Sequence, residues 1–194
     1  MKLILASASP RRQKILKDLG VPFEVQVSQV PEELNFSLQP GKLVETLACL
    51  KATNVGKEVE EGLIIGADTI VVLGEKILGK PTTSVEAEKM LRSLSGQEHL
   101  VFSGLAVVDG KTGQQQLGHE ITRVHFQQLT VPEINSYIAS GEPFDKAGGY
   151  GIQGKGGLFV EKIDGCYFNV VGLPIHLLYR FLKKMGVDLL SITS

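Results

Sequence analysis

The sequence lacks several features that would place it in a specialised class of protein. No apolar run among its 194 residues approaches the roughly 18 residues that a membrane-spanning helix needs. We therefore expect no membrane span. The formal net charge is −1, so no basic excess indicates general nucleic-acid binding. Repeats, linkers and low-complexity segments are also missing. We therefore expect a single globular domain over residues 1–194.

Cysteine and histidine patterns are equally sparse. Cys49 and Cys166 form no Cys-x-x-Cys pair, and no signal-peptide pattern precedes the first predicted strand. The four histidines show no metal-ligand spacing, and no Gly-x-Ser-x-Gly elbow is present. We therefore expect a cytoplasmic protein in a reducing setting, with neither a zinc site nor a nucleophilic serine.

What the sequence does contain is an alternation of helix and strand patterns. Helical spacing and capping signals predict helices over 10–19, 42–55, 83–96, 130–141 and 174–185. Strands are predicted over 3–5, 21–27, 62–74, 100–108, 116–127, 158–163 and 166–171, with a short strand before Lys80. Residues 31–41 and 142–157 are predicted loops. Because hairpins interrupt the alternation, the fold class is predicted to be α/β with a mixed sheet.

The first predicted helix carries an unusual charge pattern. Ser9 and Pro10 are favourable as N-cap and first helical residue, but Arg11 and Arg12 then add positive charge to the positive end of the helix dipole. The arginines either point to solvent or bind an anion together with helix amides and the Ser7 and Ser9 hydroxyls. The stretch alone leaves both interpretations open.

Asp68 is the most informative single residue, because the apolar strand pattern around it predicts burial. It is either paired with a lysine or loop amides, or it is a metal ligand or general base at a strand end. Lys51 and Lys80 could face the same cleft. Glu32 is a loop residue that, if not plain surface, could hold Mg²⁺ together with Asp68 and a substrate phosphate.

The glycine-rich residues 148–157 contain the pattern Gly-x-Gly-x-x-Gly, but the sequence predicts a loop before it and a strand after it. Phosphate-binding glycine motifs need the opposite order, a strand before and a helix after. A tight or flexible loop explains the glycines, but it does not explain the polar Gln153 among them or Asp145 and Lys146 just before them.

Taken together, the sequence resembles the Maf family of nucleoside triphosphate pyrophosphatases. The resemblance rests on Glu32 and on the stretches LILASASPRR (3–12), LACLKA (47–52), IIGADTIV (64–71), LGKP (78–81), LSG (94–96), DKAGGYGIQG (145–154) and NVVGLP (169–174). It implies an elongated α/β fold with a mixed sheet flanked by helices and two lobes around a central cleft, similar to inosine triphosphate pyrophosphatases.

The resemblance also implies an activity and residue roles. A nucleoside triphosphate would be hydrolysed to the monophosphate and pyrophosphate with Mg²⁺ or Mn²⁺. Asp68 resembles the family's catalytic acidic residue, as base or as metal ligand, and Glu32, Lys51 and Lys80 resemble its other active-site charges. The expected substrate-binding residues are Ser7, Arg11, Arg12, Thr69, Asp145 and Gln153.

Three of these positions, Arg12, Thr69 and Gln153, match the subgroup that acts on dTTP and UTP, with modified pyrimidine nucleotides left open as substrates. A homodimer is one expected assembly state. The alternative from another functional class is a non-catalytic nucleotide-binding regulator, because the family is associated with septum formation.

Overall fold

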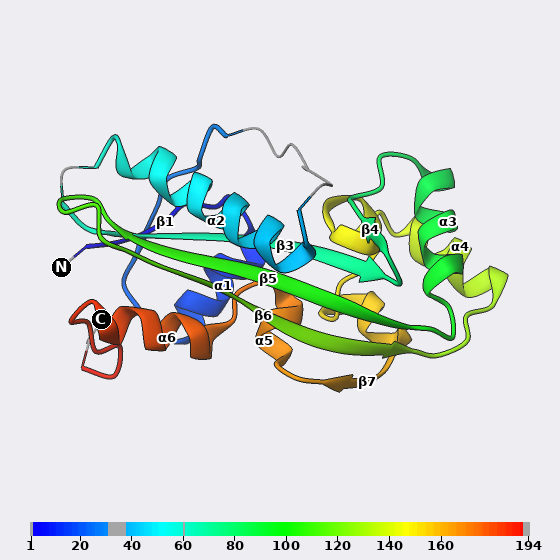
Figure 1. Cartoon of the computed structure of the whole chain (residues 1–194). Coiled ribbons are helices and arrows are strands. Elements are labelled where there is room, and N and C mark those ends of the chain that lie inside the picture. The colour runs from blue at the N-terminus through cyan, green and yellow to red at the C-terminus, as the bar shows by residue number, and fades with distance from the viewer. Residues whose placement is uncertain (1, 31–37, 60, 192–194) are drawn as a thin grey trace. The chain divides into compact units, whose positions relative to one another are not determined.

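The computed structural model describes residues 2–30, 38–59 and 61–191 (Figure 1). Its strands form one seven-stranded sheet. The strands are β1 (Leu3–Leu5), β2 (Glu24–Val25), β3 (Leu63–Leu73), β4 (Lys76–Leu78), β5 (Glu98–Asp109), β6 (Gln115–Phe126) and β7 (Val160–Asp164). The order is β2-β1-β3-β5-β6-β7, with β4 paired to β3. Since β1 pairs in parallel with β2 and β3, while β4 and β7 pair antiparallel, the predicted mixed α/β class is confirmed.

The chain divides into two compact units, neither of which is continuous in sequence. Unit 1 comprises Met1–Asp68, Ser103–Glu120 and Gly172–Ser194, and unit 2 comprises Thr69–Phe102 and Ile121–Val171. Strands β3, β5 and β6 each continue from one unit into the other. The two-lobed cleft expected from the sequence stays a prediction.

Unit 1 contains the helices α1 (Pro10–Asp18), α2 (Pro40–Gly56) and α6 (Ile175–Lys184). Gly66 of β3 allows α2 to pack unusually close, because a Cβ atom at this position would lie 2.2 Å from the Ala48 carbonyl oxygen. The small residues of this contact belong to a buried cluster made of Ile4, Ala6, Ala48, Ala52, Val55, Ile64, Ala106 and Val108. The backbone of α2 therefore lies directly against the sheet.

Unit 2 contains the helices α3 (Ser84–Leu94), α4 (Val131–Ala139) and α5 (Tyr167–Val171), with α3 and α4 side by side (Figure 1). Three short 3-10 helices, η1 (Glu142–Asp145), η2 (Ala147–Gly149) and η3 (Gly154–Phe159), occupy the glycine-rich region. The hydrophobic core of unit 2 consists of Val71, Leu91, Leu94, Val101, Val124, Phe126, Leu129, Ile134, Tyr137, Tyr150 and Phe159. The region predicted to be an irregular loop is thus partly ordered as 3-10 turns.

Local capping signals are largely confirmed. Ser9 caps α1 and accepts a hydrogen bond from the Arg12 amide, and Thr130 with Glu133 forms the complete predicted capping box of α4. The Thr83 side chain also caps α3, but the Glu86 carboxylate binds Thr82 instead of closing the box. Helix α2 begins at Pro40, inside the segment predicted to be a loop.

The strand predicted over 166–171 is wrong, since residues Tyr167–Val171 form helix α5. Tertiary hydrogen bonds explain the difference. The buried Asn169 amide donates to the Val101 carbonyl and to the Thr122 hydroxyl, and this hydroxyl also bonds the backbone of Cys166. These bonds override the strand preference of an aromatic and β-branched run. Strand β7 likewise begins at Val160 rather than at Leu158, because η3 extends to Phe159.

Candidate functional site

Asp68 and Lys51 form a nearly buried ion pair in unit 1. Lys51 Nζ lies 2.6 Å from Asp68 Oδ1, and each side chain is 10% exposed. Lys51 belongs to α2. This helix approaches β3 closely at Gly66, which precedes Asp68 by two residues, and the close approach brings Lys51 next to Asp68. The predicted burial of Asp68 is confirmed, and of the alternatives left open by the sequence, pairing with a lysine is present.

The pair leaves part of the carboxylate available. Oδ1 accepts the lysine hydrogen bond, whereas Oδ2 has no hydrogen-bond donor in the described part of the chain. An ionised carboxylate oxygen without a protein donor can take a proton, a water molecule or a cation. Asp68 can therefore act either as a base or as a cation ligand while Lys51 fixes its orientation.

Arg12 is buried and binds the backbone next to Asp68. Its Nε donates to the Gly172 carbonyl over 2.8 Å, and one terminal nitrogen donates to the Ala67 carbonyl over 2.9 Å and to the Ser7 hydroxyl over 3.1 Å. Ser7, Arg12 and Asp68 are thus brought together, because Ala67 immediately precedes the carboxylate. Hydrogen bonds to neutral carbonyl oxygens thus stabilise the positive charge of Arg12, which is unfavourably placed with respect to the helix dipole.

Arg11 differs from its neighbour, because its side chain is only half-buried. It lies in the first turn of α1, which contains no acidic residue. The amino end of this helix, with its Ser9 cap, keeps the polarity that suits an anion. The two arginines that the sequence treats as a pair therefore occupy different environments.

The remaining predicted substrate residues belong to unit 2. The Gly148 amide donates to the Gly79 carbonyl over 2.9 Å, which joins the segment of Lys80 to the glycine-rich loop. Lys80 and Asp145 are exposed, and Asp145 pairs with Lys146. Thr69 is half-buried on β3.

Gln153 is half-buried in the glycine-rich loop, and its side-chain amide makes no hydrogen bond to the residues that the structure describes. The structure thus gathers the predicted residues into two sets, one in each unit. Unit 1 holds Ser7, Arg11, Arg12, Lys51 and Asp68, and unit 2 holds Thr69, Lys80, Asp145 and Gln153.

Sequence reasoning missed the groups that hold the glycine-rich loop. Glu142 accepts hydrogen bonds from the amides of Lys155 and Gly156, and His99 Nε2 lies 2.7 Å from the Tyr150 hydroxyl. These partners are 13 to 51 positions apart along the chain, so no local spacing could have indicated them. Burial lowers the pKa of His99 to about 4, with a further contribution from the charge of His125.

Glu32, the other predicted metal ligand, lies outside the described residues, and its role stays a prediction. Among residues 2–30, 38–59 and 61–191, no group of three or more His, Cys, Asp and Glu side chains is arranged to hold a metal ion. A single carboxylate is nevertheless compatible with Mg²⁺, which is commonly bound by one or two carboxylates and substrate phosphates. Asp68, with Oδ2 available, fits this requirement.

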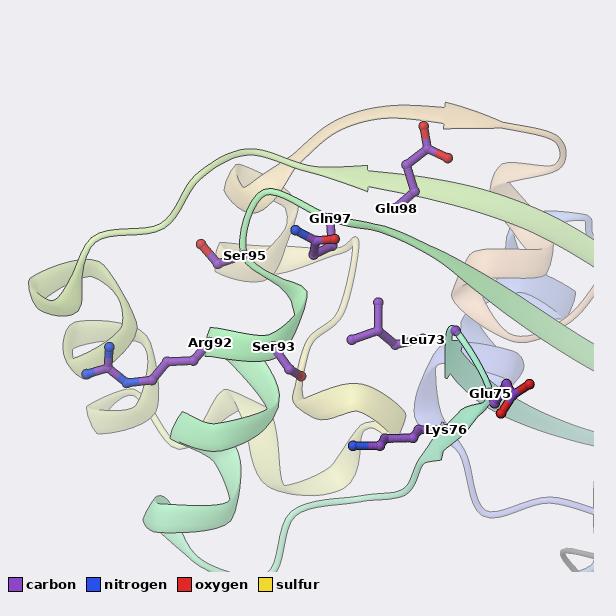
Figure 2. A pocket seen from close by; sticks show the side chains of 9 residues that line it. Leu73, Glu75, Lys76, Arg92, Ser93, Ser95, Gln97 and Glu98 are labelled. Carbon is purple, nitrogen blue, oxygen red and sulfur yellow. The ribbon is translucent and has the colours of Figure 1, made fainter.

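A hollow of about 720 Å³ opens in unit 2 between the β3–β4 turn and the end of α3. In Figure 2, Lys76, the first residue of β4, extends toward α3, whereas the Arg92 side chain points away from the hollow. The lining of the hollow carries charges of both signs and includes none of the predicted site residues. In the same described ranges, no helix is long and apolar enough to cross a membrane.

Comparison with known proteins identifies the family. The sequence profile described as "Maf-like protein" matches residues 2–185, so the chain belongs to the Maf family. A protein of Desulforamulus reducens named dTTP/UTP pyrophosphatase is 54% identical over 96% of this chain and 98% of its own length. Proteins with the same name from Carboxydothermus hydrogenoformans and Pelotomaculum thermopropionicum are 52% and 46% identical, over 96% and 97% of this chain and 100% and 99% of their own lengths.

The solved structure of the Staphylococcus aureus Ham1 protein aligns with 65% of this chain and 72% of that chain. Its TM-score is 0.46, and the sequence identity is 12%.

Proposed function

We propose that this chain hydrolyses dTTP and UTP to the monophosphate and pyrophosphate. Support comes from its membership of the Maf family and from relatives with this name that are 46% to 54% identical over nearly their whole lengths. The observation that carries the chemistry is the nearly buried Asp68, held by Lys51 through one oxygen and open at the other.

The reaction transfers the nucleoside phosphoryl group to water. The water oxygen forms a bond to the α-phosphorus while the bond to the oxygen that bridges the α- and β-phosphorus atoms breaks, and pyrophosphate leaves with that bonding pair. As the base, Asp68 Oδ2 accepts the water proton, and the hydrogen bond from Lys51 to Oδ1 keeps the carboxylate oriented. The role of Asp68 as a cation ligand is the second form of the same proposal.

A divalent cation, Mg²⁺ or Mn²⁺, would be held by Asp68, Glu32 and the substrate phosphates, and it would offset phosphate charge when bound. The triphosphate brings about four negative charges, which the amino end of α1, Arg11 and Lys80 would receive. Ser7 would add a hydroxyl, although it already accepts a hydrogen bond from Arg12. In this arrangement Arg12 acts mainly by fixing the backbone beside Asp68.

Gln153 would select the base. Uracil and thymine present a carbonyl acceptor beside an N–H donor, and a glutamine amide carries the complementary pair. The Gln153 amide has no competing partner among the described residues, which leaves it available for this contact. Thr69 and Asp145 complete the proposed substrate-binding set. Cytosine reverses the donor pattern, so we expect it to be disfavoured.

A substrate panel with the released anion identified tests the proposal. We expect pyrophosphate release, with kcat/KM for dTTP and UTP at least about tenfold above that for CTP and purine triphosphates. Activity should disappear in EDTA and return with Mg²⁺ or Mn²⁺. Release of orthophosphate would instead indicate a triphosphatase. Nucleotide binding without any hydrolysis would indicate the non-catalytic regulator.

The expected homodimer and cytoplasmic location stay predictions. Sedimentation at several protein concentrations and microscopy of a tagged chain would test them.

A further inference from the structure

We propose that Glu142 is a positioning residue that fixes the loop carrying Gln153 and thereby sets the preference between nucleobases. The inference rests on the proposed function, because Gln153 reads the base only in that proposal. It concerns a residue that lies outside both predicted sets of site residues and that no motif in the sequence indicated.

One carboxylate collects three hydrogen-bond donors. The amide of Lys155 donates to Glu142 Oε2 over 3.1 Å, and the amide of Gly156 donates to Oε1 over 3.1 Å. The Tyr137 hydroxyl, from α4, also donates to Oε1 over 3.1 Å. Hydrogen bonds to an ionised acceptor are stronger than neutral ones, so the bonds to the two amides hold the backbone directly after Gln153.

The backbone before Gln153 lies against the same part of the loop. The Gly151 backbone and the Tyr137 hydroxyl are both close to Gly156. A Cβ atom on Gly156 would lie 2.5 Å from the Gly151 carbonyl oxygen and 2.7 Å from the Tyr137 hydroxyl, so only glycine allows this approach. Residues 151 and 156 therefore close a short loop, with Gln153 inside it and Tyr137 and Glu142 at its base.

This closure matters because the Gln153 amide has no hydrogen-bond partner among the described residues. Its position therefore depends strongly on the position of its backbone. A pair of hydrogen bonds to a base edge needs a donor and an acceptor held within a fraction of an ångström. Fixing residues 151, 155 and 156 supplies that placement before the nucleotide arrives.

Glu142→Gln tests the proposal, because it keeps the size of the side chain but loses the charge and one acceptor oxygen. We expect the ratio of kcat/KM for UTP over CTP to fall about tenfold, mainly through a higher KM for UTP. The amides of Lys155 and Gly156 should exchange hydrogen at least about tenfold faster. A residue that only supported the fold would lower kcat for both substrates alike.

Glu161→Gln is the matched control, since Glu161 is an exposed residue of β7 in the same unit. It should leave the substrate ratio and both amide exchange rates unchanged. Glu142→Asp, which keeps the charge on a shorter stem, should restore part of the ratio, and it replaces Glu142→Gln if that variant does not fold. A folded variant with an unchanged ratio and unchanged exchange would overturn the proposal.

Gln153→Leu separates this proposal from the one on which it rests. If Glu142→Gln lowers the UTP preference and Gln153→Leu does not, the base is read by another part of the loop, and the positioning role of Glu142 stands. If the protein hydrolyses no nucleotide, the exchange rates of Lys155 and Gly156 still decide whether Glu142 fixes the loop. Unchanged exchange in that case would overturn the inference.

Discussion

Asp68 is expected to contribute both to turnover and to the stability of the fold, and substitutions can distinguish the two contributions. Asp68→Asn should lower turnover on UTP by at least about a hundredfold, because an amide oxygen is too weakly basic to accept a proton from water. The variant should also be less stable, since it removes the carboxylate charge that pairs with the nearly buried Lys51 ammonium. Steady-state turnover, measured well below the melting temperature of the variant, checks the prediction.

Two further variants make the interpretation secure. Asp18→Asn is the surface control, because Asp18 makes an exposed ion pair with Lys14, and we expect it to behave like the wild type. The double variant Lys51→Met with Asp68→Asn removes both charges and should recover much of the lost stability without recovering turnover. Near-normal turnover of folded Asp68→Asn would remove this residue from the reaction.

At the scale of elements, the packing of α2 against the sheet determines where Lys51 lies. Gly66→Ala should destabilise the protein by about 1–3 kcal/mol and reduce turnover, because the added methyl group would overlap the Ala48 carbonyl and push α2 away from β3. Free energies of unfolding from urea titration, together with turnover on UTP, measure the two effects.

Gly56→Ala is the control within the same helix. Its Cβ atom would make only an ordinary contact, 3.7 Å from Ile64 Cδ1, and alanine is the better helix former. We therefore expect a change of less than about 1 kcal/mol, in the stabilising direction. If Gly66→Ala proved as harmless as Gly56→Ala, the close approach of α2 would not be what positions Lys51.

Elements with strong local signals could be predicted from the sequence, and those set by distant contacts could not. The Ser9 cap and the Thr130–Glu133 capping box depend on neighbours within three positions, and both are present. Helix α5 was missed because Asn169 and Thr122 determine it through contacts across 47 positions.

The candidate site divides in the same way. The burial of Asp68 follows from an apolar strand pattern, whereas its partner was left open between a lysine, loop amides and a metal ion, because any of them would offset the cost of a buried charge. The binding of Arg12 to the carbonyls of Ala67 and Gly172 does not follow from the sequence, since the acceptors are backbone atoms that have no residue signature. The same holds for the two backbone amides that Glu142 binds.

For the whole molecule, His99 makes stability depend on pH. Nε2 contacts the Tyr150 hydroxyl, and Nδ1 has no partner among the described residues, so protonation would add a buried donor without an acceptor. The pKa of His99 is accordingly lowered from 6.5 to about 4. Between these values the unfolded chain binds a proton that the folded chain does not, so stability falls as the pH drops from 6.5 toward 4.

Free energies of unfolding at pH 7.5 and pH 5 test this expectation. The His99 contribution should amount to about 2 kcal/mol between the two conditions. His99→Gln should remove that part of the pH dependence, while His176→Gln, at an exposed position of α6, should retain it. Equal pH dependence in the wild type and His99→Gln would show that His99 is not the responsible group.

The discontinuous division of the chain has a consequence for biosynthesis. The last residue of unit 2 is Val171, whereas unit 1 needs the segment that starts at Gly172. A nascent chain that has just passed Val171 already contains Asp68 and Lys51, but it lacks the Gly172 carbonyl that binds Arg12 and the buried leucines of α6. Amino-terminal parts usually fold first during translation, but here we expect unit 1 to be completed after unit 2 has been synthesised. The unit that carries Asp68 can be completed only when the segment that starts at Gly172 has been synthesised.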